Sequence, residues 1–450
     1  MMRSLLKVSA TLSLVGCLFA SMAASAGPKI EFWTLDSGLR VYYVGIDDLP
    51  MLDINVTFDA GSARDGDKYG LANLTLSMLD EGAAGKDADE LSEAFESVGA
   101  NFYASASKDM ANIGLRTITL KKPFDSAVND WLSVIKSPEF PEANLERLKK
   151  QLMVSFEGAK QRPSSIAGKA FNENLYGDHP YANPGSGTEE SIVTISTDDL
   201  KAFYKQYVVE ENAMVSIVGN VSRAEAEALA KRVADVLIAG KKPEPIPEVK
   251  PLTESKTVFI PFPSSQATVI MGQTGYKRGD PDYFKLYLAN HPFGGSGFTS
   301  RLMKEVRVKR GLSYGVSSYF SPSRELGPFV MSLQTKIAQV DEAKKVMTDM
   351  LATYLKEGPT KEEIEGSKLN ISGGFPMNIA GNSNIGNYVD VIGFFGLPLD
   401  YLERFTDEID SITQEQAKEA MQRRVNPDAM LTIVVGGESK EDEKKDGASK

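Results

Sequence analysis

The chain has 450 residues, of which 42% are hydrophobic and 25% are charged, and its formal net charge at pH 7 is -11. A chain of this length and composition can bury a large core, and the length favours two or more domains. The acidic balance argues against a nucleic-acid partner, because binding to phosphates depends on clustered lysine and arginine side chains.

The first 26 residues have the layout of a cleavable secretory signal peptide. Arg3 and Lys7 precede an apolar run over residues 8–24, and small residues end the segment at Ala26. Cleavage there removes two of the 50 basic residues and none of the 61 acidic ones, which leaves a net charge of -13. We expect a periplasmic protein; the alternative is a lipid anchor on Cys17, because the residues around it resemble the box cut in bacterial lipoproteins. No other stretch reaches the ~18 apolar residues that span a bilayer.

The rest of the chain mixes the patterns of strands and helices. Residues 52–58 alternate hydrophobic and polar side chains, as a strand with one buried face does, whereas residues 224–237 have the spacing of an amphipathic helix. These patterns predict an α+β fold in which helices pack against mostly antiparallel sheets.

The sequence repeats itself once. Thr197 begins a predicted helix that leads to a buried strand at 213–219, and the same helix and strand pattern recurs 216 residues later, from Thr413. A shorter echo, displaced by 213 residues, pairs the segment that starts at Pro163 with the one that starts at Pro376. Gene duplication is the simplest explanation, and it predicts two similar domains, each with one sheet.

Composition and the repeat together divide the chain into five segments. The spaced prolines between the repeats favour an extended, semi-rigid linker, and the C-terminal tail is too polar to fold. The segments are a signal peptide at 1–26, an N-terminal domain at 27–240, a linker at 241–251, a C-terminal domain at 252–436 and a disordered tail at 437–450.

One basic stretch of the second repeat carries two candidate binding residues. Gly311 is predicted to end a helix, which leaves Arg307 in the last turn and Tyr314 on the following strand. A guanidinium and a phenol can both donate hydrogen bonds to a carbonyl oxygen as it becomes negative. On spacing alone, the alternative is that Arg307 complements a helix C-terminus and Tyr314 is a half-buried strand aromatic.

Other conspicuous residues have a structural explanation. Gly294, Gly295 and Gly297 could present backbone amides to an anion, but the lysine and spacing of a P-loop are missing, so a flexible turn is favoured. His179 and His291 each precede a proline and are more than a hundred residues apart, which favours loop or core packing over a short metal motif.

Several stretches occur in an order known from one family of peptidases. They are LDSGLRV at 35–41, DAGSARD at 59–65, GLA at 70–72, YGDHPY at 176–181 and AMVSIVG at 213–219. This run resembles the pitrilysin/insulinase family, which includes the mitochondrial processing peptidases, and the resemblance covers nearly the whole mature chain. It implies that each domain has the fold shared by LuxS-type and processing-peptidase metallopeptidases.

The resemblance implies a zinc site that has lost its chemistry. Catalytic members carry H-x-x-E-H on a helix, with two histidines on one face as zinc ligands and the glutamate as general base. The segment GLANLTLSMLDEG has Asn73 and Ser77 at the histidine positions and Leu76 at the glutamate position. An amide and a hydroxyl cannot replace two imidazoles on zinc, and leucine cannot transfer a proton.

The third zinc ligand of the family also has no counterpart. It is a glutamate on a later helix, and the matching stretch, 151–154, reads QLMV, with Glu157 one to two turns away. We therefore expect this chain to bind no cofactor and expect zinc in a partner subunit.

The resemblance assigns roles to residues elsewhere. In the family, an arginine and a tyrosine spaced like Arg307 and Tyr314 bind the substrate backbone and stabilise the oxyanion. The glycines at 294–297 resemble the substrate-sensing loop of the non-catalytic processing-peptidase subunit, although the loop is much shorter here. Residues 99–106 correspond to the edge strand to which an extended peptide adds through main-chain hydrogen bonds.

These observations predict the non-catalytic, substrate-binding subunit of a heterodimeric periplasmic zinc metallopeptidase, inactive without an H-x-x-E-H partner, that acts on extended peptides. The first alternative is a scaffold or peptide-binding protein with no proteolytic role. The second is an independent zinc peptidase with unusual ligands. Other peptidase mechanisms find no support, because the mature chain has no cysteine and no G-x-S-x-G motif.

Overall fold

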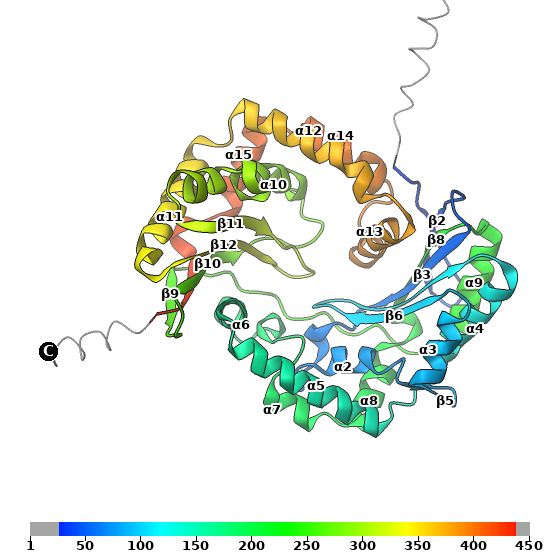
Figure 1. Cartoon of the computed structure of the whole chain (residues 1–450). Helices are drawn as coiled ribbons and strands as arrows, with labels where there is room; N and C mark the ends of the chain where they lie inside the picture. The colour runs from blue at the N-terminus through cyan, green and yellow to red at the C-terminus, as the bar shows by residue number, and fades with distance from the viewer. Residues whose placement is uncertain (1–26, 438–450) are drawn as a thin grey trace, which may run out of the picture.

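The computed structural model describes residues 27–437, which form two halves of similar design (Figure 1). The predicted signal peptide with Cys17 and nearly all of the predicted tail lie outside these residues, although Gly437 pairs with Phe262 in a β-bridge. Within the described residues, no helix is long and apolar enough to cross a membrane.

The first half contains one large sheet, a small hairpin and eight helices among the described residues. Its strands are β1 (Glu31–Thr34), β2 (Arg40–Gly45), β3 (Met51–Phe58), β4 (Gly82–Ala83), β5 (Lys86–Asp87), β6 (Asn101–Ala106), β7 (Ala111–Ile118) and β8 (Ala213–Gly219). Its helices are α2 (Leu71–Ser77), α3 (Ala88–Glu96), α4 (Lys121–Lys136), α5 (Glu142–Lys160), α6 (Pro163–Tyr176), α7 (Glu189–Thr194), α8 (Thr197–Tyr207) and α9 (Arg223–Val236).

The second half repeats this plan with one sheet. Its strands are β9 (Lys256–Ile260), β10 (Gln266–Thr274), β11 (Ser313–Phe320), β12 (Pro328–Lys336) and β13 (Leu431–Val435). Its α-helices are α10 (Tyr283–Asn290), α11 (Val340–Glu357), α12 (Lys361–Asn378), α13 (Asn382–Phe395), α14 (Tyr401–Ser411) and α15 (Gln414–Arg424), and two π-helical segments cover His291–Gly295 and Met303–Lys309.

The two sheets have matching strand orders, which confirms the predicted duplication and the α+β fold. The first sheet runs β1-β2-β8-β3-β7-β6, and the second runs β9-β13-β10-β12-β11. In each sheet a single pair is parallel, β2 with β8 and β9 with β13, and the other pairs are antiparallel. The repeated helices α8 and α15 both begin with a capping box, closed by Ser196 and by Thr413 respectively. The sequence repeat pairs Thr413 with Thr197, so it is displaced by one residue from the helix starts.

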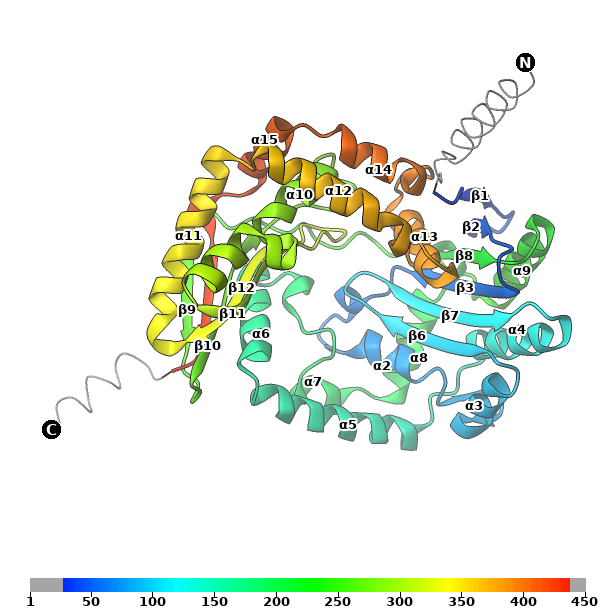
Figure 2. The same ribbon diagram turned by 45° about the horizontal axis from the view of Figure 1, so that its top comes forward.

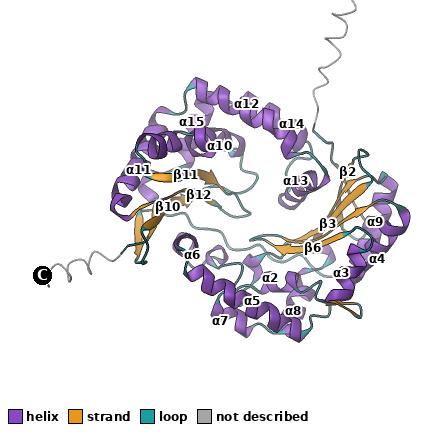
Figure 3. Cartoon of the chain, in the orientation of Figure 1, coloured by secondary structure: helices purple, strands orange, loops and turns teal. Residues whose placement is uncertain are grey.

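One helix of each half packs on the sheet of the other half. Helix α13 of the second half packs on β3 and β8, and α6 of the first half packs on β10 and β13 (Figure 2). Figure 3 shows the two sheets as separate groups of strands, with α6 and α13 on the sides that face the opposite half.

Glycines permit the close approach of these exchanged helices. A Cβ atom at Gly393 of α13 would lie 2.6 Å from the side chain of Met214 on β8, and one at Gly272 of β10 would lie 2.7 Å from the ring of Phe171 on α6. Real Cβ atoms do not approach other atoms this closely, so a larger residue would push either helix away from its sheet.

The face of β3 under α13 is polar but buried. Leu52, Ile54 and Val56 point into the core of the first half, whereas the alternating residues Asn55 and Thr57 lie under the exchanged helix. Buried polar groups need partners. The helix supplies one, Asp390.

Asp390 joins the two halves through hydrogen bonds in a buried site. Its carboxylate accepts hydrogen bonds from Asn55 Nδ2 at 2.7 Å and from Ser216 Oγ at 2.5 Å. Burial raises the pKa of Asp390 to about 6, although the hydrogen bonds from Ser216 and Asn55 oppose the shift.

The linker is held in place rather than acting as a free spacer. Ile246 and Val249 are buried in a hydrophobic cluster shared by the two halves. Arg64 donates to the carbonyl oxygen of Glu244 at 2.6 Å, and the backbone N–H of Val249 donates to the carboxylate of Glu325 at 3.4 Å. Prolines leave the linker extended with its carbonyl groups free, so side chains of both halves bind it along its length.

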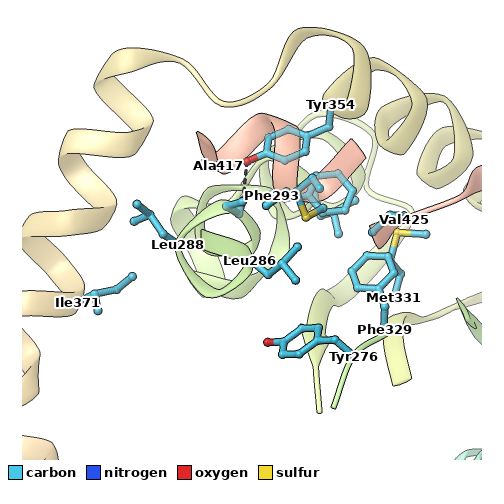
Figure 4. Packing of buried hydrophobic residues seen from close by; sticks show 14 of the residues in the cluster. Tyr276, Leu286, Leu288, Phe293, Phe329, Met331, Tyr354, Ile371, Ala417 and Val425 are labelled. Atoms are coloured by element: carbon cyan, nitrogen blue, oxygen red, sulfur yellow. Dashed lines mark hydrogen bonds between the residues drawn. The ribbon is translucent and has the colours of Figure 1, made fainter. Parts of the chain in front are cut away.

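The second half has a core that surrounds α10. Leu286 and Leu288 point from this helix toward different parts of the cluster, and Phe293 follows it (Figure 4). The hydroxyl of the buried Tyr354 donates to the carbonyl oxygen of Ala289 at 2.5 Å, which satisfies a phenol inside the core.

The buried carboxyl of Asp390 predicts a pH-dependent contribution to stability. The folded chain keeps this proton up to about pH 6, whereas the unfolded chain releases it near the ordinary aspartate pKa of 3.8. The stabilisation is therefore complete below pH 4 and is lost as the pH rises through 6. In urea unfolding, the free energy of unfolding of the native chain relative to Asp390→Asn should fall by about 2.4 kcal/mol between pH 4 and 7.

The substitution to asparagine suits this test because its amide can donate to Ser216 and accept from Asn55. Asp407→Asn, on the exposed face of α14, is the matched control. A difference between the native chain and Asp390→Asn that does not change with pH would show that this carboxyl does not stay protonated in the folded chain.

Candidate functional site

Two of the three degenerate positions on α2 line a pocket of about 500 Å³. Asn73 and Ser77 face this pocket from α2, and Gln151 faces it from α5. The fold therefore brings together the positions that the family resemblance assigned to three zinc ligands. Leu76, at the position of the base, is fully buried in the core and does not line the pocket.

The start of α2 depends on a side chain outside the helix. Gly70 precedes the helix with φ of +96° and has no side chain to cap it. Asp65 caps it instead, because its carboxylate accepts hydrogen bonds from the backbone N–H groups of Gly70 at 2.7 Å and Ala72 at 2.8 Å. Burial raises the pKa of Asp65 to about 7, although these two hydrogen bonds oppose the shift.

The side chain of Asn73 holds a loop instead of a metal. Its Nδ2 donates to the carbonyl oxygen of Gly185 at 2.7 Å, and residues 183–186 form another wall of the same pocket. Residue 185 is a glycine. A Cβ there would lie 3.1 Å from Ser62 Oγ and 3.4 Å from Asn73 Nδ2, so the loop packs closely against Ser62 and against α2.

The groups around this pocket do not suit zinc. Asn73, Ser77 and Gln151 offer amide and hydroxyl groups, whereas protein zinc sites use thiolates, imidazoles and carboxylates. Nowhere in residues 27–437 do three or more histidine, cysteine, aspartate or glutamate residues form a group that could hold a metal ion. Glu157 lies farther along α5, where it is exposed and paired with Lys160.

Lys108 is a charged residue of the pocket wall that the sequence analysis missed. Its ammonium donates to the carbonyl oxygen of Tyr181 at 3.3 Å and lies over the rings of Tyr176 and Tyr181, at 4.9 and 4.7 Å from their centroids. Burial lowers the pKa of Lys108 to about 8, and the charge of Asp109 partly opposes the shift. A lysine in the loop after an edge strand has no spacing signal that marks it in advance.

The predicted edge strand is present beside the pocket. Strand β6 is the last strand of its sheet and pairs with β7 alone among the described strands. Its final residue, Ala106, and the following Ser107 line the pocket. A peptide added to the free edge of β6 would therefore run toward the pocket.

The helix end near Arg307 is as predicted. The π-helical segment ends at Lys309, Gly311 follows with φ of +62°, and Tyr314 lies on β11. The side chain of Tyr314 is 84% exposed, so the alternative of a half-buried strand aromatic is wrong.

Arg307 differs from the basic residues next to it. Lys309 and Arg310 both pair with the carboxylate of Glu305, at 2.9 and 3.0 Å. The guanidinium of Arg307 instead lies 4.7 Å from the centroid of the exposed Phe298 ring and makes no hydrogen bond or ion pair with the described residues. Neither Arg307 nor Tyr314 lines the pocket beside α2.

The glycines before this helix are needed for packing more than for flexibility. Gly294 is buried in a π-helical turn, and a Cβ there would lie 2.2 Å from Ser318 Oγ. A Cβ at Gly295 would lie 3.1 Å from Asn290 Nδ2, and only Gly297, with φ of +60°, has open space around it. The expected flexible turn is therefore wrong for Gly294. The segment leads instead to Phe298, which the sequence analysis did not single out.

Both histidines make structural contacts. A ring nitrogen of His179 accepts from the backbone N–H of Tyr181 at 3.1 Å, and the other lies 2.8 Å from the carbonyl oxygen of Pro247. The ring of His291 bonds to side chains of α12, Ser367 at 2.9 Å and Asn370 at 3.1 Å.

Comparison with known proteins agrees with this geometry. Residues 50–189 match the family model for insulinase (peptidase family M16), and residues 194–371 match the model for the peptidase M16 inactive domain. A crystal structure of a peptidase M16 inactive domain from Pseudomonas fluorescens is 38% identical, with a TM-score of 0.88 over 91% of this chain and 98% of that chain.

Relatives with curated names include one called a non-peptidase and one called a zinc protease. "Non-peptidase homolog YmxG" of Helicobacter pylori is 26% identical over 87% of this chain and 90% of its own length. "Uncharacterized zinc protease YmxG" of Bacillus subtilis is 26% identical over 78% of this chain and 84% of its own length. Given the likeness to the Pseudomonas protein along nearly its whole length, this chain belongs to the M16 (insulinase) peptidase family, as a member in which an amide, a leucine and a hydroxyl replace the H-x-x-E-H groups.

Proposed function

We propose that this chain is the non-catalytic, substrate-binding subunit of a two-chain periplasmic zinc metallopeptidase. Its partner would be a family member with an intact H-x-x-E-H motif and zinc, and the substrate an extended peptide. One observation carries the proposal: Tyr314 is exposed and Arg307 has no ion pair among the described residues, although residues 27–437 contain no group of histidine, cysteine, aspartate or glutamate side chains that could hold a zinc ion.

The two side chains suit the carbonyl oxygen of a peptide bond under attack. A guanidinium and a phenol donate hydrogen bonds that strengthen as the oxygen becomes negative. Phe298 holds the guanidinium of Arg307 through its ring face, which contributes about 0.5–1 kcal/mol at an exposed site. The arginine is thereby oriented without an anionic partner that would compete with the substrate.

The first half offers a place for the rest of the peptide. The free edge of β6 provides backbone groups for strand addition, and the pocket beside α2 offers amides and hydroxyls that can bind further backbone groups. These neutral groups bind a peptide without cleaving it.

A second candidate function is peptide binding with no role in proteolysis. The pocket beside the free edge of β6, which offers polar groups but no zinc ligands, favours it, because neither feature needs a catalytic partner. In that case Arg307 and Tyr314 would have no effect on any peptidase.

Peptide hydrolysis by a mixture of the two subunits distinguishes these two functions. A quenched, unstructured peptide should be hydrolysed by the mixture of this chain with an H-x-x-E-H family member encoded by the same genome, and not by this chain alone. Arg307→Ala or Tyr314→Phe in this chain should each lower kcat/KM of the mixture about 100- to 1,000-fold, because each removes a donor to the developing oxyanion.

Matched controls lie next to both residues. Arg310→Ala removes a neighbouring arginine that is paired with Glu305, and Tyr319→Phe removes a hydroxyl farther along β11. Both should leave the activity within about twofold, as expected for surface groups. A catalytic partner that works equally well alone would contradict the proposal and leave peptide binding as the function.

The pocket beside α2 also predicts how zinc binding could be restored. The native chain should retain no stoichiometric zinc after dialysis, because it offers no suitable ligands there. The triple variant Asn73→His, Ser77→His, Gln151→Glu should bind one zinc ion per chain, measured by metal analysis and by titration with a chromophoric chelator. All three side chains face the same pocket, which is the reason for the expected gain.

The double variant Ser77→His, Gln151→Glu is the control. With two ligands it should bind zinc at least about tenfold more weakly than the triple variant. A triple variant that folds with the native circular dichroism spectrum but binds no zinc would show that these positions do not have the geometry of the family's metal site.

A further inference from the structure

A second pocket, of about 260 Å³, lies in the second half and shares no residue with the pocket beside α2. It is bounded by the turn before α10, the start of that helix, the loop after α13 and the exposed side of α14. Its apolar lining is mostly aromatic and comprises Pro281, Tyr283, Phe284, Leu397, Pro398 and Tyr401.

Most of the charges around this pocket neutralise one another. Asp280 pairs with Arg424 at 2.7 Å. Arg404 pairs with Asp400 at 3.5 Å and also with Glu408. Arg404 is shared by two carboxylates, so this part of the lining keeps one surplus negative charge. The guanidinium of Arg278 is the one lining charge without an ion pair among the described residues.

Arg278 has no ion pair or side-chain hydrogen bond with the described residues. Its guanidinium lies against aromatic rings, 5.6 Å from the centroid of Tyr283 and 5.7 Å from that of Phe395. Its Nε is buried without a hydrogen-bond partner. A buried donor that is left unpaired destabilises a protein, and more so when it is charged, so this group favours an anion that can reach it.

The phenols around Arg278 can assist in binding an anion. Burial raises the pKa of Tyr401, and the neighbouring Tyr283 adds to the shift. The Tyr401 hydroxyl therefore stays protonated at neutral pH and can donate a hydrogen bond.

We infer that this pocket binds a carboxylate that is joined to an aromatic or branched apolar group. The unpaired guanidinium selects the carboxylate, and the aromatic walls select the apolar group. The volume is below the range of about 300–1,000 Å³ for drug-sized ligands, so it suits a ligand of the size of one amino acid. Such a group occurs in a free arylalkyl acid and at the C-terminus of a peptide. The inference does not depend on the proposed function, because none of these residues belongs to the peptidase-like site.

Four probes test the inference by isothermal titration calorimetry. They are N-acetyl-phenylalanine, its amide, the peptide Ala-Ala-Ala-Phe with a free C-terminus, and the same peptide amidated. At least one of the acids should bind, and its amide should bind at least about tenfold more weakly, because a charge-assisted hydrogen bond is lost. Binding of both acids identifies peptide C-termini as ligands, and binding of the small acid alone identifies free acids.

Two arginines of the same pocket provide the variant and its control. Arg278→Gln should weaken the binding of the acid at least about tenfold, and Arg278→Lys should have a smaller effect because it keeps the charge but loses the planar fork. Arg404→Gln should stay within about twofold, because the charge of Arg404 is already neutralised. Thermal unfolding of each variant confirms that it is folded.

Three results would overturn the inference. They are the failure of both acids to bind the folded native chain at millimolar concentration, equal binding of acids and amides, and a loss in Arg404→Gln as large as that in Arg278→Gln.

Discussion

The reciprocal exchange of α6 and α13 is the constraint on which the rest of the structure depends. Neither half covers both faces of its own sheet, because one face of each sheet packs against a helix from the other half. The hydrogen bonds of Asp390 to Asn55 and Ser216, and the bond from Arg40 to the carbonyl oxygen of Gly393, join residues that are far apart in sequence. The two halves therefore form one body.

The same exchange shapes both pockets. Helix α6 leads into the loop that Asn73 holds over α2, and Asn172 of α6 lines the pocket beside α2. Helix α13 ends at Phe395, against which Arg278 packs, and the loop that follows closes one side of the second pocket. A duplicated fold has thus acquired two different cavities, one lined by amides, hydroxyls and Lys108 and one built around Arg278 among aromatic rings.

Local signals explain how much could be predicted from the sequence. Strand alternation, the repeated helix starts and the glycine after Arg307 are local features, and the predicted fold, duplication and helix end are confirmed. The edge position of β6 also agrees, because it follows from the family fold. Asn73 and Ser77 line one pocket with Gln151, which belongs to the stretch 151–154 that the resemblance matched to the third zinc ligand. The chemistry of individual side chains was harder to predict when it depended on distant neighbours. Gly294 was interpreted as flexible, but Ser318 on a later strand leaves no room there for a Cβ.

The residues that were missed share this dependence. Lys108 has its lowered pKa because it is buried beside the rings of Tyr176 and Tyr181, about 70 residues away. Arg278 stands out only because the acidic groups near its pocket pair with other arginines. The pKa of Lys108 depends on its burial, and the lack of an ion pair at Arg278 depends on which arginines the nearby acidic residues pair with. Neither can be read from residue spacing.

The polar row on β3 has a consequence for the order in which the chain folds. Helix α13 follows β8, the last strand of the first sheet, only after a long stretch of chain, so the face that carries Asn55 and Thr57 can form before its cover is in place. An apolar face left open for that time would invite aggregation, whereas amide and hydroxyl groups can be hydrated until the helix arrives. Docking of α13 therefore dehydrates the polar groups of Asn55 and Thr57 and, in the same step, covers the apolar side chain of Met214 beside them.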